Sequence, residues 1–316
     1  MSVPKISICV VTYNQVNYIR KCLESLLNQN VDCDFELIVG DDCSSDGTRD
    51  VLLAMEKEYP GKLKLVMHTT NQGPIGNYFS VHNLAQGEFV CHLDGDDYAL
   101  PGKLQAQIDF MRQHPDCRIV WHRMVILNEQ GQTAVGMPVC PLDQLLGKNK
   151  FYLADLAVLY GTTGCHSGSM YRRSAKKMSA YPFPTIDYYI TMTFVSDGGY
   201  AAYINEPYGV YRFFKQDKTL TRQKGGMYVG LAQLDLIPQL LKTHPEIRRQ
   251  LAAQTLFELF TRCYLRYPLK WRFLKLFFSC RALPRLSDLR QIWKVFNASR
   301  YQNLAAAFKT GYQGKI

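Results

Sequence analysis

Residues 89–97 read FVCHLDGDD, a short apolar run that ends in three carboxylates within four positions. Two earlier stretches have the same form, because each is an apolar run that leads directly into polar side chains. They are ISICVVT at Ile6–Thr12, followed by Tyr13 and Asn14, and FELIVG at Phe35–Gly40, followed by Asp41 and Asp42. Short apolar runs bounded by turn-forming residues are typical of buried strands. The three stretches therefore predict three strands, each with a polar cluster at its carboxyl end.

The segments between these runs carry the hydrophobic period of helices, which predicts an α/β fold for the first half of the chain. Asn17 opens the first helix, and a further strand is expected at Leu63–Met67. Later helices are expected at Thr48–Tyr59, at Tyr78–Ala85 and from Pro101 to Gln113. Such alternation builds a mostly parallel sheet flanked by helices, and ligands bind outside the carboxyl ends of its strands. We therefore expect the three polar clusters to face one crevice.

The alternation weakens past residue 114, where strand-like pieces at Ile119–Trp121 and Ser169–Tyr171 lie on either side of a loop-rich stretch. From Tyr228 onward the pattern becomes helical. The expected helices are Val229–Leu241, Glu246–Tyr267, Trp271–Leu283 and Leu289–Phe296. The sequence therefore predicts a domain of residues 1–225 and a helical C-terminal region of residues 226–316.

Composition narrows the class of protein. A chain of 316 residues with 47% hydrophobic residues can bury a large core, which excludes a disordered or collagen-like chain. Its ten cysteines lie singly, with no C-x-x-C pair and no secretory leader before the first predicted strand. We therefore expect reduced thiols and a cytoplasmic location. No apolar stretch reaches the roughly 20 residues of a membrane-spanning helix.

Charge is distributed unevenly along the chain. Residues 212–316 hold 20 Lys and Arg against 5 Asp and Glu, a net charge of +15, whereas residues 1–211 have 17 against 22, a net charge of −5. The segment Leu269–Phe278, as a helix, would present a broad apolar face with Trp271 and Phe273 and basic residues at its ends. These features predict that the region binds peripherally to an anionic membrane. The alternatives are packing on the first domain, a contact with the acceptor, or a homo-oligomer contact. No nucleic-acid-binding motif accompanies it, so no nucleic-acid partner is expected.

The acidic cluster Asp94-Gly95-Asp96-Asp97 calls for a cation, because neighbouring carboxylates repel one another. Mg²⁺ and Mn²⁺ take one or two carboxylates together with phosphate oxygens and water. A solvated turn is the simpler interpretation of one such cluster, but the second pair, Asp41-Asp42, with Tyr13 beside it, favours a binding site. A nucleotide suits this site. An Asp can accept a hydrogen bond from uracil N3–H, the base can stack on Tyr13, and a metal ion on Asp96 can neutralise a diphosphate.

Three motifs in order resemble the family-2 glycosyltransferases, inverting enzymes with a GT-A fold, which is a Rossmann-like sheet flanked by helices. They are VVTYN at Val10–Asn14, VGDDCSSDGT at Val39–Thr48 and GEFVCHLDGDDYALPGKLQAQ at Gly87–Gln107. The resemblance covers residues 3–215 and implies a nucleotide-sugar donor, most often a UDP-sugar, and Mn²⁺ or Mg²⁺ as cofactor. By this resemblance, Val11 and Tyr13 line the nucleobase, Asp42 binds it, Asp94 and Asp96 form the DxD pair with the metal ion on Asp96, and Asp97 supports them.

The resemblance also implies a general base at an acidic residue that opens a later helix. Asp187 matches this position, although Ile186 replaces the Glu that commonly precedes the base in the family. The simpler interpretation of Asp187 is a carboxylate stabilised by a helix N-terminus. Upstream, His166 lies in a segment that resembles the strand beside the acceptor, where it could contact acceptor or donor or be purely structural.

A second departure from the family concerns the metal. Tyr211-Arg212 matches a Tyr-Arg-x-His element, but the position of the His is Phe214 in this chain. A third protein ligand to the metal ion is therefore in doubt. Arg212, Lys215 and Lys218 remain as alternative contacts to the diphosphate.

These observations predict a metal-dependent inverting transfer of a hexose or N-acetylhexosamine to a hydroxyl of a glycan or lipid-linked acceptor. Bacterial surface polysaccharide or lipopolysaccharide synthesis is the expected setting. The alternative is a non-catalytic nucleotide-sugar-binding scaffold, which would be expected to have lost Asp96 or Asp187; both are present. A dinucleotide oxidoreductase would need a G-x-G-x-x-G loop after the first strand, where this chain has Thr12-Tyr13-Asn14-Gln15.

Overall fold

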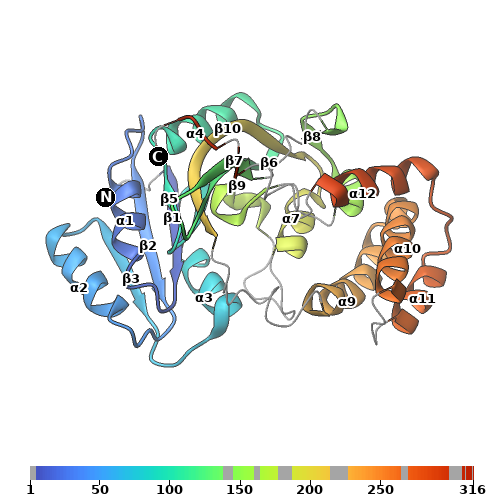
Figure 1. Ribbon diagram of the computed structural model, residues 1–316, viewed down its shortest axis with the longest axis horizontal. Helices are drawn as coiled ribbons and strands as arrows, with labels where there is room; N and C mark the ends of the chain where they lie inside the picture. Colours follow the sequence, from blue (N-terminus) through green and yellow to red (C-terminus); the bar gives the residue numbers. More distant parts are fainter. Residues whose placement is uncertain are drawn as a thin grey trace.

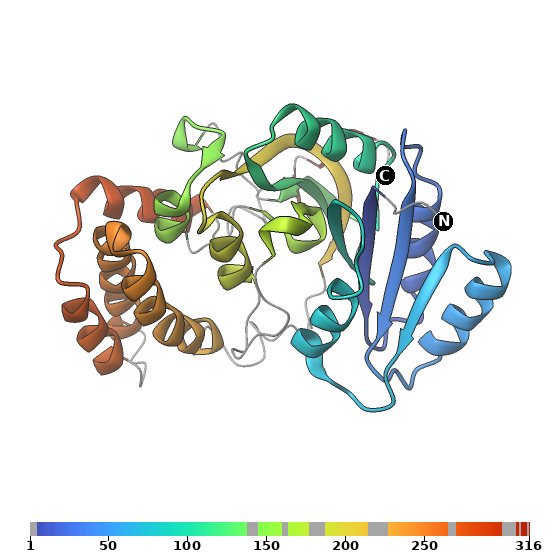
Figure 2. The same cartoon turned by 180° about the vertical axis from the view of Figure 1, so that it is seen from behind.

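The structure is a computed structural model that describes residues 5–137, 145–159, 164–176, 187–213, 227–264, 270–298, 308–309, 311–314 and 316. Figures 1 and 2 show a sheet-containing part with helices on its faces and a group of C-terminal helices at one end of the molecule. No helix among the described residues is long and apolar enough to cross a membrane.

The first four strands lie parallel in the order β3-β2-β1-β4. Their bounds are β1 Ile6–Thr12, β2 Phe35–Asp41, β3 Leu63–Met67 and β4 Phe89–Asp94. All four confirm the predicted strands to within one residue. The register places Thr12 beside Asp41 and Val11 beside Asp94, so the three polar clusters do follow neighbouring strand ends.

The other strands form a part of the sheet that contains both parallel and antiparallel pairs. These strands are more continuous than the sequence pattern past residue 114 suggests. They are β5 Tyr98–Ala99, β6 Cys117–Asn128, β7 Thr133–Met137, β8 Lys150–Phe151, β9 Ser169–Arg172 and β10 Tyr200–Phe213. The strand β9 runs antiparallel between β4 and β6, and β10 lies parallel to β6. The strand β10 was not predicted, because Pro207 and Gly209 interrupt its pattern; the register shifts at both residues.

Helices of the first half cover both faces of the sheet (Figure 1). They are α1 Ile19–Leu27, α2 Thr48–Glu58, α3 Gly73–His82 and α4 Lys103–Gln113, followed by α6 Leu153–Val158 and α7 Asp187–Val195. Two 3₁₀ turns, η1 His166–Gly168 and η2 Arg173–Ala175, lie on either side of β9. The helix expected at Tyr78–Ala85 begins five residues earlier, because Pro74 suits the first turn of a helix.

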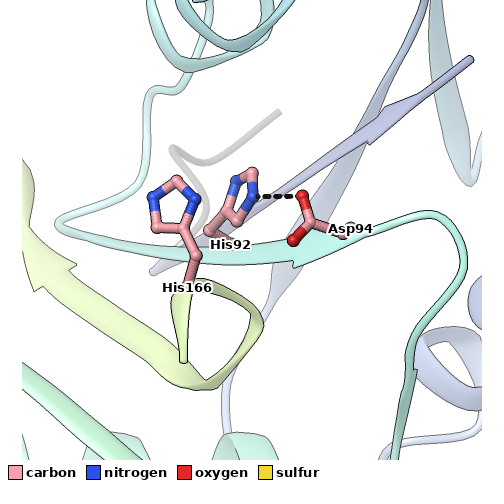
Figure 3. Close-up of side chains that lie close together, drawn as sticks. All are labelled: His92, Asp94 and His166. Atoms are coloured by element: carbon pink, nitrogen blue, oxygen red, sulfur yellow. Dashed lines mark hydrogen bonds and ion pairs between the residues drawn. The ribbon is translucent and has the colours of Figure 1, made fainter. Parts of the chain in front are cut away.

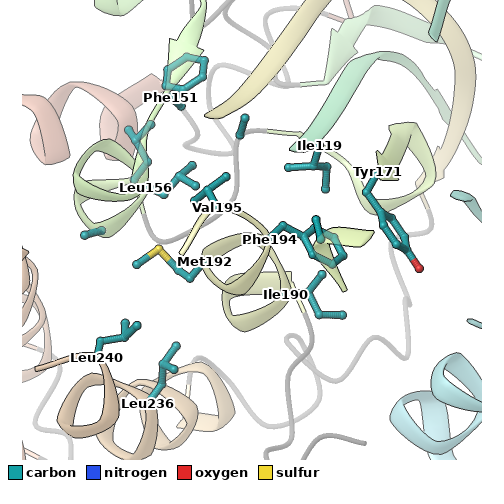
Figure 4. Close-up of a cluster of buried hydrophobic side chains, with 14 of the residues drawn as sticks. Ile119, Phe151, Leu156, Tyr171, Ile190, Met192, Phe194, Val195, Leu236 and Leu240 are labelled. Carbon is teal, nitrogen blue, oxygen red and sulfur yellow. The ribbon is translucent and has the colours of Figure 1, made fainter. Parts of the chain in front are cut away.

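The C-terminal helices are α9 Met227–Thr243, α10 Arg248–Tyr264, α11 Lys270–Ser279 and α12 Leu286–Ala298, with the 3₁₀ turn η3 Pro245–Ile247 before α10. They share one core cluster with the sheet, in which Leu236 and Leu240 of α9 lie near Met192 of α7 (Figure 4). Phe273 of α11 is fully buried in the same cluster. The expectation that Phe273 lies on an exposed apolar face is therefore wrong, because its side chain faces the other helices.

Candidate active site

The loops after β1 and β2 are joined by hydrogen bonds, which makes the two strand ends one wall of the site. The backbone N–H of Asn14 donates to Ser44 Oγ at 2.9 Å, and Asn14 Oδ1 accepts the N–H of Ser45 at 2.9 Å. Asn14 takes a positive φ of 53°, a conformation that Asn tolerates better than most residues. The neighbouring Tyr13 is 49% exposed, so its ring is accessible from solvent, and its contact with a nucleobase stays a prediction.

Asp42 is buried beneath this wall and is held in one orientation. Its Oδ1 accepts the N–H of Gln72 at 2.6 Å, and its carbonyl accepts Asn71 Nδ2 at 3.1 Å. Burial raises the pKa of Asp42, and the hydrogen bond from the N–H of Gln72 offsets part of this rise. The side chain of the neighbouring Asp41 supports the loop after β2, because its Oδ2 accepts the N–H of Ser44 at 3.1 Å.

Asp94 lies at the end of β4 with both carboxylate oxygens engaged. Its Oδ1 is 3.2 Å from His92 Nε2, and its Oδ2 accepts the hydroxyl of Ser167 at 3.1 Å (Figure 3). Burial by itself raises the pKa of Asp94, but His92, then His166 and Ser167, outweigh it and bring the pKa to about 2. Asp94 is therefore ionised over the whole physiological range.

Asp97 and Arg212 bring the end of β10 to the acidic cluster. Asp97 Oδ1 accepts the N–H of Arg212 at 3.0 Å, while Asp97 Oδ2 is buried and has no hydrogen-bond partner among the described residues. Burial, and then the charges of Asp96 and Asp94, raise the pKa of Asp97 well above its usual range. The guanidinium of Arg212 donates to the carbonyl of Asp96 and lies 4.9 Å from the ring centroids of both Tyr18 and Tyr98.

A buried chain of hydrogen bonds extends inward from Asp94 and was not predicted from the sequence. His92 Nδ1 is 2.9 Å from His82 Nε2, and His82 Nδ1 is 2.8 Å from the hydroxyl of Tyr171. Burial lowers the pKa of His92 to about 4 and that of His82 well below its usual range, so both rings are neutral. The sequence held one indication of a contact between His92 and Asp94. The two residues are two positions apart on a predicted strand, so their side chains face the same side of the sheet.

A second buried support of the site is Lys103, which was likewise not predicted from the sequence. Its side chain is fully buried, and its ammonium group donates to the carbonyl of Ser167. Ser167 in turn accepts the N–H of Asp94 at 3.0 Å. Lys103 therefore fixes the turn that holds the first carboxylate of the cluster.

A pocket extends from this network toward α7. It lies among β6, η1, β9 and α7 and is lined by Tyr78, Ile119, Trp121, Gly164, His166, Ser169, Tyr171, Ile190, Thr191 and Phe194. The helix α7 begins at Asp187, as predicted, but the side chain of Asp187 lies outside what the structure describes. Phe214, Lys215 and Lys218 also lie outside the described residues.

The remaining predicted residues lie at the same edge of the sheet. Val11 is partly buried and packs against the larger core cluster, and Asp96 is partly exposed next to Arg212. The structure thus brings together Val11, Tyr13, Asp42, Asp94, Asp96, Asp97 and Arg212. Their roles toward a ligand stay predictions.

Comparison with known proteins agrees with the fold. The model of the glycosyl transferase family 2 matches residues 7–178. The chain therefore belongs to glycosyl transferase family 2, which confirms the predicted family. It has the GT-A-like fold, with its central sheet flanked by helices and a set of C-terminal helices beside it.

Several individual proteins are similar to this chain. The putative glycosyltransferase EpsE of Bacillus subtilis is 29% identical over 173 residues, which are 54% of this chain and 58% of EpsE. The putative teichuronic acid biosynthesis glycosyltransferase TuaG of the same organism is 28% identical over 210 residues, 66% of this chain and 79% of TuaG. The chain spans about half the length of the first curated relatives it matches.

Among solved structures, S. aureus TarS in complex with UDP superposes with a TM-score of 0.65 at 19% sequence identity. The match covers 97% of this chain and 90% of that chain. A further structure of TarS is in complex with UDP-GlcNAc. At this level of identity the likeness establishes a shared fold.

Proposed function

We propose that this protein transfers a sugar, with inversion, from a UDP-sugar to a hydroxyl of a glycan or lipid-linked acceptor in bacterial surface polysaccharide synthesis. The observation that carries the proposal is the convergence of Asp42, Asp96 and Arg212 on one sheet edge beside the exposed ring of Tyr13. Membership of glycosyl transferase family 2 and similarity to TuaG and EpsE support it.

The two loops that follow β1 and β2 would hold the nucleoside. The exposed ring of Tyr13 offers a surface for stacking, and the partly buried Val11 at the end of β1 would line the base. Asp42 is an acceptor held in place by the N–H of Gln72, which suits the N3–H of uracil. Complexes of the structural neighbour TarS with UDP and UDP-GlcNAc support the choice of a uridine donor and an N-acetylhexosamine or hexose as the sugar.

The residues at the end of β4 fit a hard divalent cation, Mn²⁺ or Mg²⁺. Asp96 is partly exposed, and the buried Asp97 Oδ2 has no partner among the residues that the structure describes. Carboxylate oxygens are the ligands that both ions prefer. Asp96 would hold the ion, whose charge would help to neutralise the diphosphate when bound. The guanidinium of Arg212, which lies 4.9 Å from two aromatic ring centroids, would add a second positive charge there.

Asp187 would act as the general base of the transfer. It would accept the proton of the acceptor hydroxyl while that oxygen attacks the anomeric carbon from the face opposite the diphosphate. The bond from the anomeric carbon to the diphosphate oxygen breaks, and UDP leaves, so one displacement inverts the configuration. The position of Asp187 at the start of α7, next to the pocket that ends at Ile190 and Thr191, supports this assignment.

We further propose that residues 1–225 form the catalytic domain, while residues 226–316 place the protein on the cytoplasmic face of a membrane where the acceptor lies. The net charge of +15 over residues 212–316 supports a contact with anionic lipid. This placement is independent of the chemistry above and has its own test below.

A donor screen tests the proposed reaction. Purified protein with Mn²⁺ is incubated with UDP-, GDP- and dTDP-sugars, and release of the nucleoside diphosphate is measured with and without chelator. We expect UDP-sugars to be turned over best, and chelation to abolish turnover. Faster turnover of GDP- or dTDP-sugars would contradict the uridine assignment. Tight UDP-sugar binding without turnover, with or without glycan acceptors, would favour the non-catalytic scaffold.

A further inference from the structure

Three side chains with metal-ligating atoms meet beside the nucleotide site, although only one of them is an acidic residue of the cluster. They are His92 and Asp94 on β4 and His166 on η1, and one ligating atom from each lies within 4.8 Å of the other two. Figure 3 shows them in a row, with His92 between His166 and Asp94. The His92 and His166 ring centroids are 4.0 Å apart.

Outer contacts orient two of these side chains. His92 Nδ1 is 2.9 Å from His82 Nε2, which is itself fixed by the hydroxyl of Tyr171 at 2.8 Å. Ser167 donates to the second oxygen of Asp94 at 3.1 Å. Metal-ligating histidines usually place their second nitrogen in such a hydrogen bond, and ligating carboxylates are similarly supported. The cluster therefore has the outer layer of contacts that protein metal sites have.

The protonation of His92 allows its Nε2 to serve as a ligand. A neutral imidazole carries one hydrogen, and when that hydrogen is on Nδ1 it can be donated to His82 Nε2. An ion placed between Nε2 and Asp94 Oδ1, which are 3.2 Å apart, would replace the hydrogen that Nε2 donates to the ionised Asp94 in the metal-free protein. Two ligands of one metal ion at about 2.0–2.2 Å are separated by a similar distance. The third ligating atom, on His166, lies within 4.8 Å of the other two.

Access and ligand type indicate which ion would bind. The side chain of Asp94 is 37% exposed and His166 is partly exposed, so an ion can enter from solvent, whereas His92 is 1% exposed. Two imidazoles and one carboxylate favour first-row transition metals over Mg²⁺, which prefers oxygen ligands throughout. We infer that His92, Asp94 and His166 form a second metal site, distinct from the ion on Asp96, that takes Zn²⁺ or Co²⁺.

The test measures metal binding directly and so does not depend on the proposed function. Full-length protein is stripped with chelator under reducing conditions and titrated with Co²⁺, followed by visible absorption and by calorimetry. We expect one Co²⁺ to bind with a band typical of nitrogen ligation, and His166→Gln to weaken binding by at least about tenfold. His114→Gln is the matched control, because His114 is also partly buried but lies at the end of α4.

Two further variants separate this site from its neighbours. Tyr171→Phe keeps all three ligands and removes the outer hydroxyl, so Co²⁺ affinity should fall by about 10–100-fold if the buried chain orients His92. Asp96→Asn should leave Co²⁺ binding unchanged. The inference is overturned if wild type binds neither Co²⁺ nor Zn²⁺, if His166→Gln binds as wild type does, or if Asp96→Asn loses Co²⁺ equally. A strong near-ultraviolet thiolate band insensitive to His166→Gln would likewise overturn it.

Discussion

The backbone N–H of Arg212 lies 3.0 Å from Asp97 Oδ1, although the two residues are 115 positions apart in the chain. This bond ties the end of β10 to the turn after β4. The guanidinium of Arg212 consequently lies 4.9 Å from the ring centroids of both Tyr18 and Tyr98 and donates to the carbonyl of Asp96. A cation is thereby fixed beside the carboxylates at the place where a diphosphate is proposed to bind.

Replacing Arg212 with Gln should weaken binding of UDP by about ten- to a hundredfold, because hydrogen bonds to charged groups contribute about 1.5–3 kcal/mol. The contact with Asp97 uses the backbone N–H of residue 212, so the fold of the turn should persist. Calorimetric titration with UDP and with uridine measures the effect. Uridine should bind both proteins alike, and the exposed Arg290→Gln on α12 should bind UDP as wild type does. Equal affinity of Arg212→Gln for UDP would remove Arg212 from the site.

Replacing Asp187 with Asn should lower turnover by about 10²–10⁴-fold, because a positioned base contributes a factor of that size. UDP affinity should stay nearly constant, since the donor does not require the base. Initial rates of sugar transfer at saturating donor measure the first effect. Asp197→Asn, in the turn after α7, is the matched control. Transfer at the wild-type rate by Asp187→Asn would rule out the assignment of the base.

Replacing Asp96 with Ala should abolish the part of UDP binding that depends on Mn²⁺ and leave the metal-independent part. The reason is that Asp96 is partly exposed, whereas Asp97 is buried and both oxygens of Asp94 already have partners in His92 and Ser167. UDP titrations with Mn²⁺ and with chelator, on both proteins, separate the two parts. Asp50→Ala, an exposed acidic residue of α2, controls for the loss of charge. Persistence of the Mn²⁺ effect in Asp96→Ala would place the ion elsewhere.

The strand ends of the first half could be predicted because their signal is local. An apolar run followed by Asp or Asn marks both the strand and the polar cluster, and parallel pairing then places Thr12 beside Asp41 and Val11 beside Asp94. The strand β10 could not be predicted in this way, because Pro207 and Gly209 interrupt its alternation and only pairing with β6 holds it. Arg212 was predicted because Tyr211-Arg212 matches a family motif, and not from the hydrophobic pattern of its own segment.

Apart from the two-residue spacing of His92 and Asp94, no sequence pattern reveals the buried chain His92–His82–Tyr171. Its members come from β4, α3 and β9, and their contacts depend on the antiparallel pairing of β4 with β9. A single polar residue inside an apolar run, taken alone, looks like an interruption of the strand pattern and not like a member of a hydrogen-bonded chain. Phe273 shows the same limit in the C-terminal region, since helical period alone does not say which apolar face is buried.

The buried histidines predict that the protein loses stability as the pH falls from about 6.5 toward 4. Burial lowers the pKa of His92 to about 4 and those of His82 and His122 well below the usual value of 6.5. In this window the unfolded chain binds protons that the native rings do not, so the free energy of unfolding falls with falling pH. His92 alone accounts for about 3 kcal/mol. The raised pKa of Asp97 acts in the opposite direction and offsets part of the loss.

Urea unfolding at about pH 7 and pH 5 measures this dependence. His82→Gln is expected to be less stable at both values but to lose less between them, because one of the titrating rings is gone. His114→Gln, at the end of α4, serves as the control and should lose as much as wild type. A free energy of unfolding that is unchanged between the two pH values would contradict the prediction.

The exposed face of α11 predicts binding to anionic membranes. Trp271 and Phe278 are each 69% exposed, and Lys275 between them is exposed too. Positions separated by four and seven residues share one face of a helix, so aromatic rings and a basic group face solvent together. Aromatic rings suit the lipid interface, and each Lys or Arg near an anionic surface contributes about 1 kcal/mol. The wild-type protein should therefore float with anionic vesicles at low salt and be released at high salt.

A double variant, Trp271→Glu/Phe278→Glu, should not float, whereas changing Phe273 would disturb the core in which it is buried. Leu53→Glu/Leu84→Glu adds the same charge at exposed apolar positions of the first half and should float as wild type does. Vesicles of zwitterionic lipid test whether anionic lipid is required. Neither the wild-type protein nor the double variants should bind them. If wild type stays with the unbound fraction at low salt, while Trp271→Glu/Phe278→Glu lowers its mass in light scattering, then α11 faces a second copy of the chain and the membrane prediction fails.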